Sequence, residues 1–201
     1  MKNKKRLSIG YFSISAVVLV FIMSVGATEA FSGGGYFNTA QTMQMIERHL
    51  QDGQTDLSSG QLPSVARTLY EKARFYGIDY RLALAIMAVE SNFRTDAVSP
   101  AGARGIMQIR PILASSIAKE AGIPYREASD LFEPANNVRL GLYYLSWLSS
   151  IFKSTSEVLL AYNIGHNGAK RQLSRTGDAD NRYTRRVMDE YQRNKTSLPA
   201  I

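Results

Sequence analysis

Beyond its first thirty residues, the chain is most apolar at residues 83–93, which read Ala83-Leu84-Ala85-Ile86-Met87-Ala88-Val89-Glu90-Ser91-Asn92-Phe93. Asp79 precedes this run and is a plausible N-cap, so the pattern predicts a buried helix that ends near Glu90. A carboxyl at the edge of an apolar core is hard to ionise, because desolvation raises its pKa. Glu90 is therefore the candidate for a general acid working near neutral pH. The alternative for a lone glutamate is a helix-end side chain that faces solvent or pairs with an arginine.

Helical spacing continues on both sides of this run, whereas the alternation typical of strands is scarce. The further helices that we expect are one through Val65, Leu69 and Ala73 ending near Gly77, one from Pro111 to Gly122, one capped by Asn136 or Asn137, one opened by a capping box of Ser154 and Glu157, and one from Asn181 through Val187 and Tyr191. The pattern predicts a mainly α domain.

The N-terminal segment, residues 1–30, has the layout of a secretory signal peptide. Lys2, Lys4, Lys5 and Arg6 precede an uncharged apolar stretch at residues 9–25, and small residues follow it. An uncleaved membrane anchor is the alternative, because a stretch of this length is at the short end of a membrane span. Either form predicts export to the periplasm or cell envelope, in the second case with contact to the inner membrane.

The rest of the chain divides into a linker and one domain. Residues 32–35 are a run of small residues, and residues 52–63 are rich in Gly, Ser, Asp and Gln. A short amphipathic segment with Met43, Ile46 and Leu50 lies between them. We expect a linker here, whose methionine-containing face either packs on the domain or docks on a partner. The main domain is expected at residues 63–195.

Composition excludes some kinds of site and leaves the partner open. The 201 residues contain no cysteine, so there is no thiol nucleophile and no cysteine-based zinc site. The net charge of +7 falls to about +3 or +4 without the leader, which suits DNA, anionic lipid or an acidic polymer alike. Export favours an envelope polymer over nucleic acid. His49 and His166 lie in different regions and give little support for a metal site, and we expect no cofactor.

Two further clusters accompany Glu90. Residues 99–109 combine a glycine-rich turn with Met107 and Gln108, an apolar and an amide contact that suit an N-acetyl sugar. Residues 161–165 include Tyr162, which can stack on a sugar face or donate a hydrogen bond, and Asn163, which can bind an acetamido group. A tight loop over the core and a glycine-closed helix end are the structural alternatives.

Together these clusters resemble the catalytic domain of the soluble lytic transglycosylases, relatives of goose-type lysozyme. The resemblance is carried by Glu90-Ser91-Asn92-Phe93, Gly105-Ile106-Met107-Gln108, Ala161-Tyr162-Asn163-Ile164-Gly165, Leu131-Phe132-Glu133-Pro134 with Asn137 and Gly141, and Tyr183 before Arg186-Val187. It covers about residues 65–192, and five motifs in the same order are far more specific than any one.

The resemblance implies a lysozyme-like helical fold with a sugar-binding groove, and the cleavage of peptidoglycan between MurNAc and GlcNAc with formation of 1,6-anhydroMurNAc. Glu90 is the implied single acid and base. The implied substrate-binding residues are Ser91, Ser99, Met107, Gln108, Tyr162, Asn163 and Tyr183. Small exported enzymes of this kind often open the wall for secretion, conjugation or pilus machines, which makes such a machine a candidate partner.

Some positions depart from the family pattern. Arg110 stands where an apolar residue is common before Pro111, and His166 and Asn167 follow the tyrosine motif in place of Pro or Gly. Glu133 replaces a usual Asp, and Thr184 a usual Val. We expect Arg110 and His166 to alter the preference of the subsites for particular sugars.

The usual glycosidase needs two carboxyls about 5–9.5 Å apart. No convincing partner for Glu90 is evident, since Asp96 is on a loop and Asp178 and Asp180 lie in a polar stretch. A mechanism with one carboxyl is therefore expected. The competing hypotheses are a catalytically silent glycan-binding module and a nucleic-acid binder built on the basic residues Lys170, Arg171, Arg175, Arg182, Arg185 and Arg186. Intact Glu90 argues against the first and export against the second.

Overall fold

The computed structural model describes residues 37–200, and this part of the chain is helical apart from its loops, as the sequence predicts. Its helices are α1 (Thr39–Asp52), α2 (Leu62–Tyr76), α3 (Tyr80–Ser91), α4 (Pro111–Ile117), the short 3-10 helix η1 (Ala128–Phe132), α5 (Pro134–Ile151), α6 (Thr155–Ile164), α7 (His166–Thr176) and α8 (Arg182–Ser197). Among these residues, extended pairing is limited to two isolated bridges in the loop before α4.

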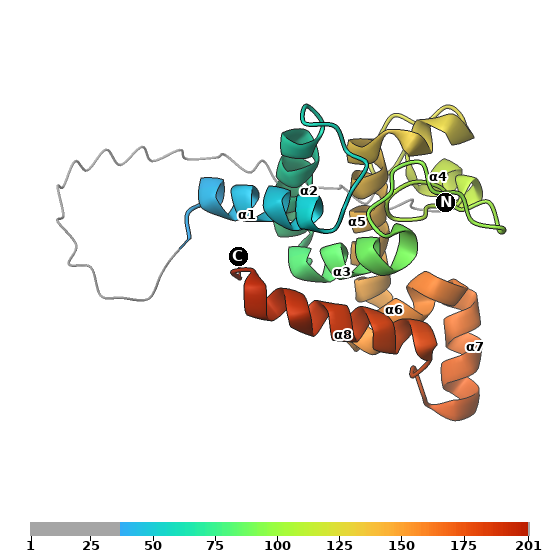
Figure 1. Cartoon of the computed structure of the whole chain (residues 1–201). Helices are drawn as coiled ribbons and strands as arrows, with labels where there is room; N and C mark the ends of the chain where they lie inside the picture. The colour runs from blue at the N-terminus through green and yellow to red at the C-terminus, as the bar shows by residue number, and fades with distance from the viewer. Residues whose placement is uncertain (1–36, 201) are drawn as a thin grey trace, which may run out of the picture. The chain divides into compact units, whose positions relative to one another are not determined.

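The apolar helix α3 lies at the centre of this unit, with α2 on one side and α8 on another (Figure 1). Ala83, Leu84, Ala85, Ile86 and Met87 have no exposed surface. An apolar side chain of leucine size stabilises the fold by about 1.5–3 kcal/mol when it is fully buried. A helix that is buried on all sides has a fixed position in the core. The position of Glu90 at its end is therefore fixed as well.

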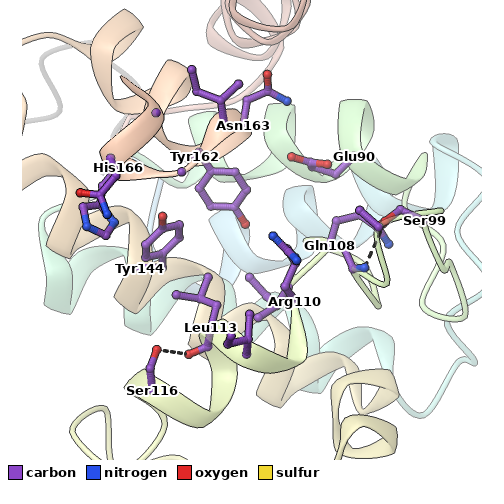
Figure 2. A pocket seen from close by; sticks show the side chains of 18 of the residues that line it. Glu90, Ser99, Gln108, Arg110, Leu113, Ser116, Tyr144, Tyr162, Asn163 and His166 are labelled. Atoms are coloured by element: carbon purple, nitrogen blue, oxygen red, sulfur yellow. Dashed lines mark hydrogen bonds between the residues drawn. The ribbon is translucent and has the colours of Figure 1, made fainter. Parts of the chain in front are cut away.

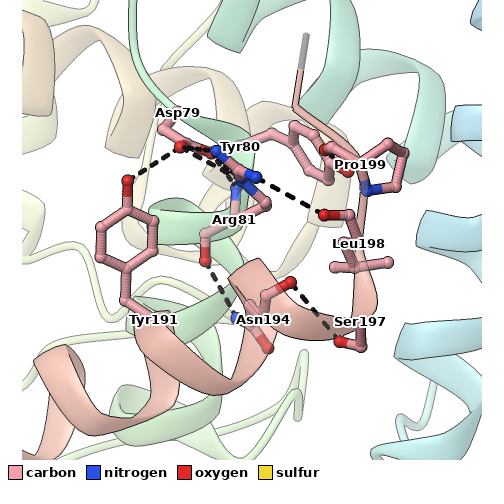
Figure 3. A network of polar contacts seen from close by, with 8 residues as sticks. All are labelled: Asp79, Tyr80, Arg81, Tyr191, Asn194, Ser197, Leu198 and Pro199. Carbon is pink, nitrogen blue, oxygen red and sulfur yellow. Dashed lines mark hydrogen bonds and ion pairs between the residues drawn. The ribbon is translucent and has the colours of Figure 1, made fainter. Parts of the chain in front are cut away.

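The first turn of α3 is fastened to the end of α8 by polar contacts (Figure 3). The Asp79 carboxylate accepts hydrogen bonds from the Arg81 guanidinium and from the Tyr191 hydroxyl. The buried amide of Asn194 donates to the Arg81 carbonyl at 2.9 Å, and the Tyr80 hydroxyl donates to the Pro199 carbonyl at 2.7 Å. These bonds fix the position of α3 along its own axis.

The last turn of α3 ends in two consecutive residues with left-handed backbone. Asn92 has φ of 53° and Phe93 has φ of 61°. Asn92 caps the helix, a position where asparagine is tolerated, but a left-handed phenylalanine is strained. Phe93 keeps this strained backbone because its neighbours in space fix its position. This fixed point lies three residues after Glu90.

The last turn of α1 and the segment that follows it hold Phe93 in place. The Phe93 ring is buried and meets the His49 ring edge-on at a centroid distance of 5.8 Å. The Thr55 hydroxyl donates to the Phe93 carbonyl at 2.9 Å, and the Asp56 carboxylate accepts from the Thr95 backbone amide at 2.8 Å. Residues 49–56 therefore clamp the turn that closes α3.

The predicted linker at residues 31–62 is thus corrected for the part that the structure describes. Ile46 and Leu50 of α1 have no exposed surface and belong to the same core as α2 and α3. The described part of the compact unit already includes residues 37–62, which precede the expected boundary at residue 63. Of the two alternatives for the amphipathic segment, the structure shows packing on the domain, and this packing makes α1 a part of the domain.

Helix ends differ from the predictions in several places. Helix α5 begins at Pro134, and the Glu133 carboxylate caps it by accepting from the backbone amides of Ala135 and Asn136, so the prediction of an Asn136 or Asn137 cap was wrong. Ser154 caps α6 as expected, but the Glu157 carboxylate bonds the Lys153 amide instead of closing the box. Helix α4 ends early, at Ile117, and α7 had not been predicted.

The predicted signal peptide or anchor at residues 1–30 lies outside the described residues. Within residues 37–200, none of the helices combines the length and the apolar character that crossing a membrane requires.

Candidate active site

A cavity of about 670 Å³ opens beside the end of α3, between the loop before α4 and the junction of α6 with α7 (Figure 2). Its labelled lining residues are Glu90, Ser99, Gln108, Arg110, Leu113, Ser116, Tyr144, Tyr162, Asn163 and His166. A cavity of this size accommodates a ligand the size of a few sugar rings. The three clusters that the sequence singles out therefore meet at one site.

Glu90 lies at the edge of this cavity with its carboxyl largely withdrawn from water. Burial raises its pKa to about 7, although the Tyr183 hydroxyl and the charge of Arg186 both lower it. Near neutral pH, protonated and ionised forms are then similarly populated. A carboxyl with this pKa can donate a proton in one step and take one up in the next.

Tyr183 holds the Glu90 carboxyl in place. Its hydroxyl donates to Oε1 of Glu90 at 2.8 Å, across 93 positions of sequence. This is the only hydrogen bond to the Glu90 side chain from the described residues, so Oε2 keeps its capacity for a ligand. Tyr183 also lines a second, shallower cavity with Asn163, Asn181, Arg182 and Arg186.

The loop before α4 has a backbone that only a few residues can adopt. Gly105 has φ of 77°, and a Cβ atom there would lie 2.3 Å from the Leu131 carbonyl oxygen and 2.4 Å from Nδ2 of Asn137. Gln108 is also left-handed, with φ of 51°, and its amide nitrogen donates to the carbonyls of Ala97 and Gly105 at 3.1 and 3.0 Å. The Gln108 amide oxygen is therefore left as an acceptor for a ligand N–H or O–H group.

Asn137 fastens this loop to α5. It has no exposed surface, and its Oδ1 accepts from the Met107 backbone amide at 2.8 Å. Its Nδ2 donates to the carbonyls of Arg104 and Leu131 at 2.9 and 2.8 Å. One buried side chain thus satisfies three backbone groups. It fixes the position of the loop relative to α5.

Two tyrosines form the floor of the cavity. The Tyr162 hydroxyl donates to the Met107 carbonyl at 2.8 Å, which leaves its ring as the surface offered to a ligand. Tyr144 lies 5.6 Å from it between ring centroids and also stacks on Trp147. Of the two, only Tyr162 was predicted. Tyr144 falls on the apolar face of α5 and carries no signal in the sequence beyond that periodicity.

The remaining predicted residues divide into two groups. Ser99 and Asn163 line the cavity, and the Ser99 hydroxyl, which accepts from the Ala103 amide at 3.0 Å, keeps its proton for donation. Ser91 and Met107 lie behind the lining, which corrects their predicted contact with substrate. The buried Ser91 hydroxyl is bound to the carbonyls of Met87 and Ile106, and Met107 has no exposed surface.

The positions that depart from the family pattern fall into two groups, those that line the cavity and those that stabilise helix ends. Arg110 and His166 line the cavity, and His166 meets the Trp147 ring edge-on at 5.1 Å. Glu133 and Thr184 are structural, since Glu133 caps α5 and buried Thr184 closes the capping box of α8 with Asn181.

Glu90 is the only carboxylate among the described residues that line this cavity. Asp96 is exposed and pairs with Arg94 at 2.9 Å, while Asp178 and Asp180 line a different cavity. The arrangement therefore provides one group for proton transfer, an amide oxygen, a hydroxyl and aromatic faces, but no second carboxyl for a nucleophile or base.

Comparison with known proteins relates the chain to one family. The chain matches the transglycosylase SLT domain model over residues 68–184. It is 38% identical over 118 residues to membrane-bound lytic murein transglycosylase C of Klebsiella pneumoniae. The aligned stretch covers 52% of this chain and 32% of that protein. It is 30% identical over 167 residues to the protein of the same name from Mannheimia succiniciproducens, covering 77% of this chain and 44% of the relative. The chain spans less than half the length of either.

Solved structures show the same fold. The 70 kDa soluble lytic transglycosylase of Escherichia coli superposes with a TM-score of 0.61 at 20% identity, covering 78% of this chain and 30% of that one. Lytic transglycosylase Slt of Pseudomonas aeruginosa gives 0.59 at 23% identity, covering 79% and 31%. The predicted lysozyme-like helical fold is confirmed. With its family model matched over more than half of its length, the chain belongs to the transglycosylase SLT domain family.

Proposed function

We propose that this protein is a peptidoglycan lytic transglycosylase that cleaves the bond between MurNAc and GlcNAc, with Glu90 as its only acid and base. The observation that supports this most is a largely buried carboxyl of raised pKa in a cavity with no second carboxylate among the described residues that line it. The related proteins are themselves called lytic murein transglycosylases.

In the first step, protonated Glu90 donates its proton to the glycosidic oxygen on C1 of MurNAc. The C1–O bond breaks, and GlcNAc leaves with a free hydroxyl. Positive charge that develops at C1 is stabilised by the 2-acetamido group of the same sugar or by the enclosing groove. The raised pKa serves this step, because the acid is protonated in a large share of molecules near neutral pH.

In the second step, ionised Glu90 removes the proton from the C6 hydroxyl of the same MurNAc. The C6 oxygen forms a bond to C1 and closes the 1,6-anhydro ring, and the proton from the C6 hydroxyl returns Glu90 to its protonated form. Atoms and charge balance without water, metal or cofactor. The hydroxyl of Tyr183 on Oε1 keeps the carboxyl aimed at the sugar through both steps.

Substrate contacts follow from the groups left free. Gln108 presents its amide oxygen to the acetamido N–H, Ser99 presents its hydroxyl, and Asn163 its amide. The Tyr162 ring provides an apolar face for a sugar ring, because its hydroxyl is already occupied. Met107 and Ser91 act indirectly, by holding the backbone on which these groups stand.

The products of digestion test the proposal. Purified cell-wall sacculi incubated with the protein are expected to release muropeptides that end in 1,6-anhydroMurNAc, detected by mass spectrometry as species one water lighter than their hydrolytic counterparts. Muropeptides with a free reducing end would instead identify a lysozyme-type hydrolase. Release of no fragment by a protein that binds sacculi would identify a glycan-binding module.

Location and biological setting belong to the same proposal. We place the protein in the periplasm or cell envelope, where peptidoglycan lies, on the basis of the N-terminal pattern at residues 1–30. N-terminal sequencing of the mature protein distinguishes a cleaved leader from an anchor at residues 9–25. Local opening of the wall for a secretion, conjugation or pilus machine is the setting that we propose, and assembly of such a machine in a strain without the protein tests it.

A further inference from the structure

The turn that ends α3 determines where Glu90 lies. Glu90 is the last residue but one of α3, and it lines the cavity (Figure 2). The Phe93 backbone amide donates to the Met87 carbonyl at 3.3 Å, and the Asn92 amide donates to the Ala88 carbonyl at 3.1 Å. Both bonds span Glu90, and both depend on the left-handed backbone after the helix. The last turn of α3 therefore keeps its form only while Phe93 keeps its position.

Residues 49–56 contact Phe93 and precede the stretch at residues 68–184 that the family model matches. The Thr55 hydroxyl donates to the Phe93 carbonyl at 2.9 Å. Gly53 lies directly against the ring, since a Cβ atom there would come within 2.4 Å of Cδ2 and 2.5 Å of Cε2 of Phe93. Gly53 has φ of −72°, which any residue adopts, so the closeness of the ring is what requires glycine here.

The turn has space beside it. A separate cavity of about 400 Å³ is lined by residues of the turn, by Gly53 and by charged residues of α8. Packing on that side therefore does little to prevent a movement of the turn. Inside the matched family domain, the turn is bound at Ser91, whose hydroxyl donates to the Ile106 carbonyl at 2.8 Å. Beyond Ser91, the contacts from residues 49–56 fix its position.

We infer that residues 49–56 position the carboxyl of Glu90 for proton transfer, with Gly53 and Thr55 acting through Phe93, an inference that rests on the proposed function. Neither Gly53 nor Thr55 lines the cavity that contains Glu90, so neither contacts the sugar. They fix the turn after Glu90, and with it the direction of the carboxyl and its shielding from water. A displacement of about 1 Å far from the chemistry lowers a rate by up to about a hundredfold.

Gly53→Ala tests this inference against a matched control. The added methyl group displaces the Phe93 ring, whereas the same methyl group in Gly60→Ala meets no atom within 4 Å. With soluble glycan strands as substrate, Gly53→Ala is expected to lower kcat about tenfold. KM is expected to stay within about twofold of the wild type, because the groups that bind the sugar stand on other segments. Gly60→Ala is expected to match the wild type in both constants.

Thr55 provides a second, milder test. Thr55→Val removes the hydroxyl that binds the Phe93 carbonyl and keeps the shape of the side chain. It is expected to lower kcat in the same way as Gly53→Ala. Thr55→Ser keeps the hydroxyl and is expected to restore kcat.

The titration of Glu90 separates this inference from the proposed function, because it needs no substrate. Carbon-13 NMR of the side-chain carboxyls is recorded for the wild type and for each variant. A displaced turn lets water reach the carboxyl, so the midpoint for Glu90 in Gly53→Ala is expected to lie about one pH unit below that of the wild type. Gly60→Ala is expected to keep the wild-type midpoint. Neither substitution alters Tyr183 or Arg186, the groups on α8 that lower the pKa of Glu90.

The outcomes differ for the two proposals. A lower midpoint in Gly53→Ala supports the positioning role even if the wild type cleaves no strand, in which case only the proposed function fails. If Gly53→Ala does not fold, Thr55→Val and Thr55→Ser decide by the same two measurements. Thermal unfolding gives the stability of each variant. A variant that loses stability but keeps kcat and the wild-type midpoint would overturn the inference, because residues 49–56 would then only stabilise the fold.

Discussion

Replacement of Glu90 by glutamine is expected to lower the rate of peptidoglycan cleavage at least about a thousandfold. General acid and base catalysis each contribute about a hundredfold to ten-thousandfold, and here one carboxyl performs both. Glutamine keeps the shape of the side chain, and its amide oxygen still accepts from the Tyr183 hydroxyl. The loss then measures proton transfer, and turbidity of a sacculus suspension follows it over time.

A matched control guards this result against a change in folding. Glu71→Gln makes the same substitution on the exposed face of α2, away from the cavity, and is expected to leave the rate unchanged. Thermal unfolding of both variants at the assay pH shows whether either is unfolded. A Glu90→Gln protein that retains a tenth or more of wild-type activity would mean that another group is the acid.

Replacement of Asn137 by alanine is expected to destabilise the fold by about 3–5 kcal/mol. The substitution leaves the Met107 amide and the carbonyls of Arg104 and Leu131 without a partner, and each unsatisfied buried group costs about 1–3 kcal/mol. It also leaves a void, since the side chain has no exposed surface. Denaturant unfolding followed by circular dichroism measures the change.

The neighbouring residue provides the comparison for Asn137. The side chain of Asn136 is only partly buried, and no hydrogen bond of its own side chain is found among the described residues, so Asn136→Ala is expected to cost less than about 1 kcal/mol. If Asn137→Ala costs as little as Asn136→Ala, the loop beside Glu90 is held by something other than this side chain.

The sequence was sufficient for the parts of the fold that are set by local pattern. A continuous apolar run predicts the buried helix α3, and its edge predicts the raised pKa of Glu90, because both depend on residues close together in the chain. The motif order likewise predicts that Gln108, Tyr162 and Asn163 meet in one cavity. None of these inferences needs the angle between helices.

Contacts between segments that are far apart in the chain could not be predicted from the sequence. In the sequence, Asn137 is of a residue type that commonly caps helices. Its role as a buried residue that binds the loop at residues 104–107 depends on the position of that loop in the fold. Residues 49–56 have the composition of a linker, but they clamp the strained turn at Phe93 through one aromatic contact and two hydrogen-bonding side chains. Ser91 and Met107 fail as contact residues for the same reason, since the direction of each side chain is set by its neighbours in space.

The titration of Glu90 tests the central claim most directly. Because its pKa in the folded protein is raised from the usual 4.5 to about 7, the carboxyl stays protonated as pH rises past 4.5 and loses its proton near pH 7. The folded state loses stability over that interval, by the sign of the linkage between protonation and folding. Carbon-13 NMR of the glutamate side-chain carboxyls, with Glu90→Gln to assign the signal, is expected to give a midpoint close to pH 7. A midpoint near 4.5 would show an ordinary solvated carboxylate and would contradict the account.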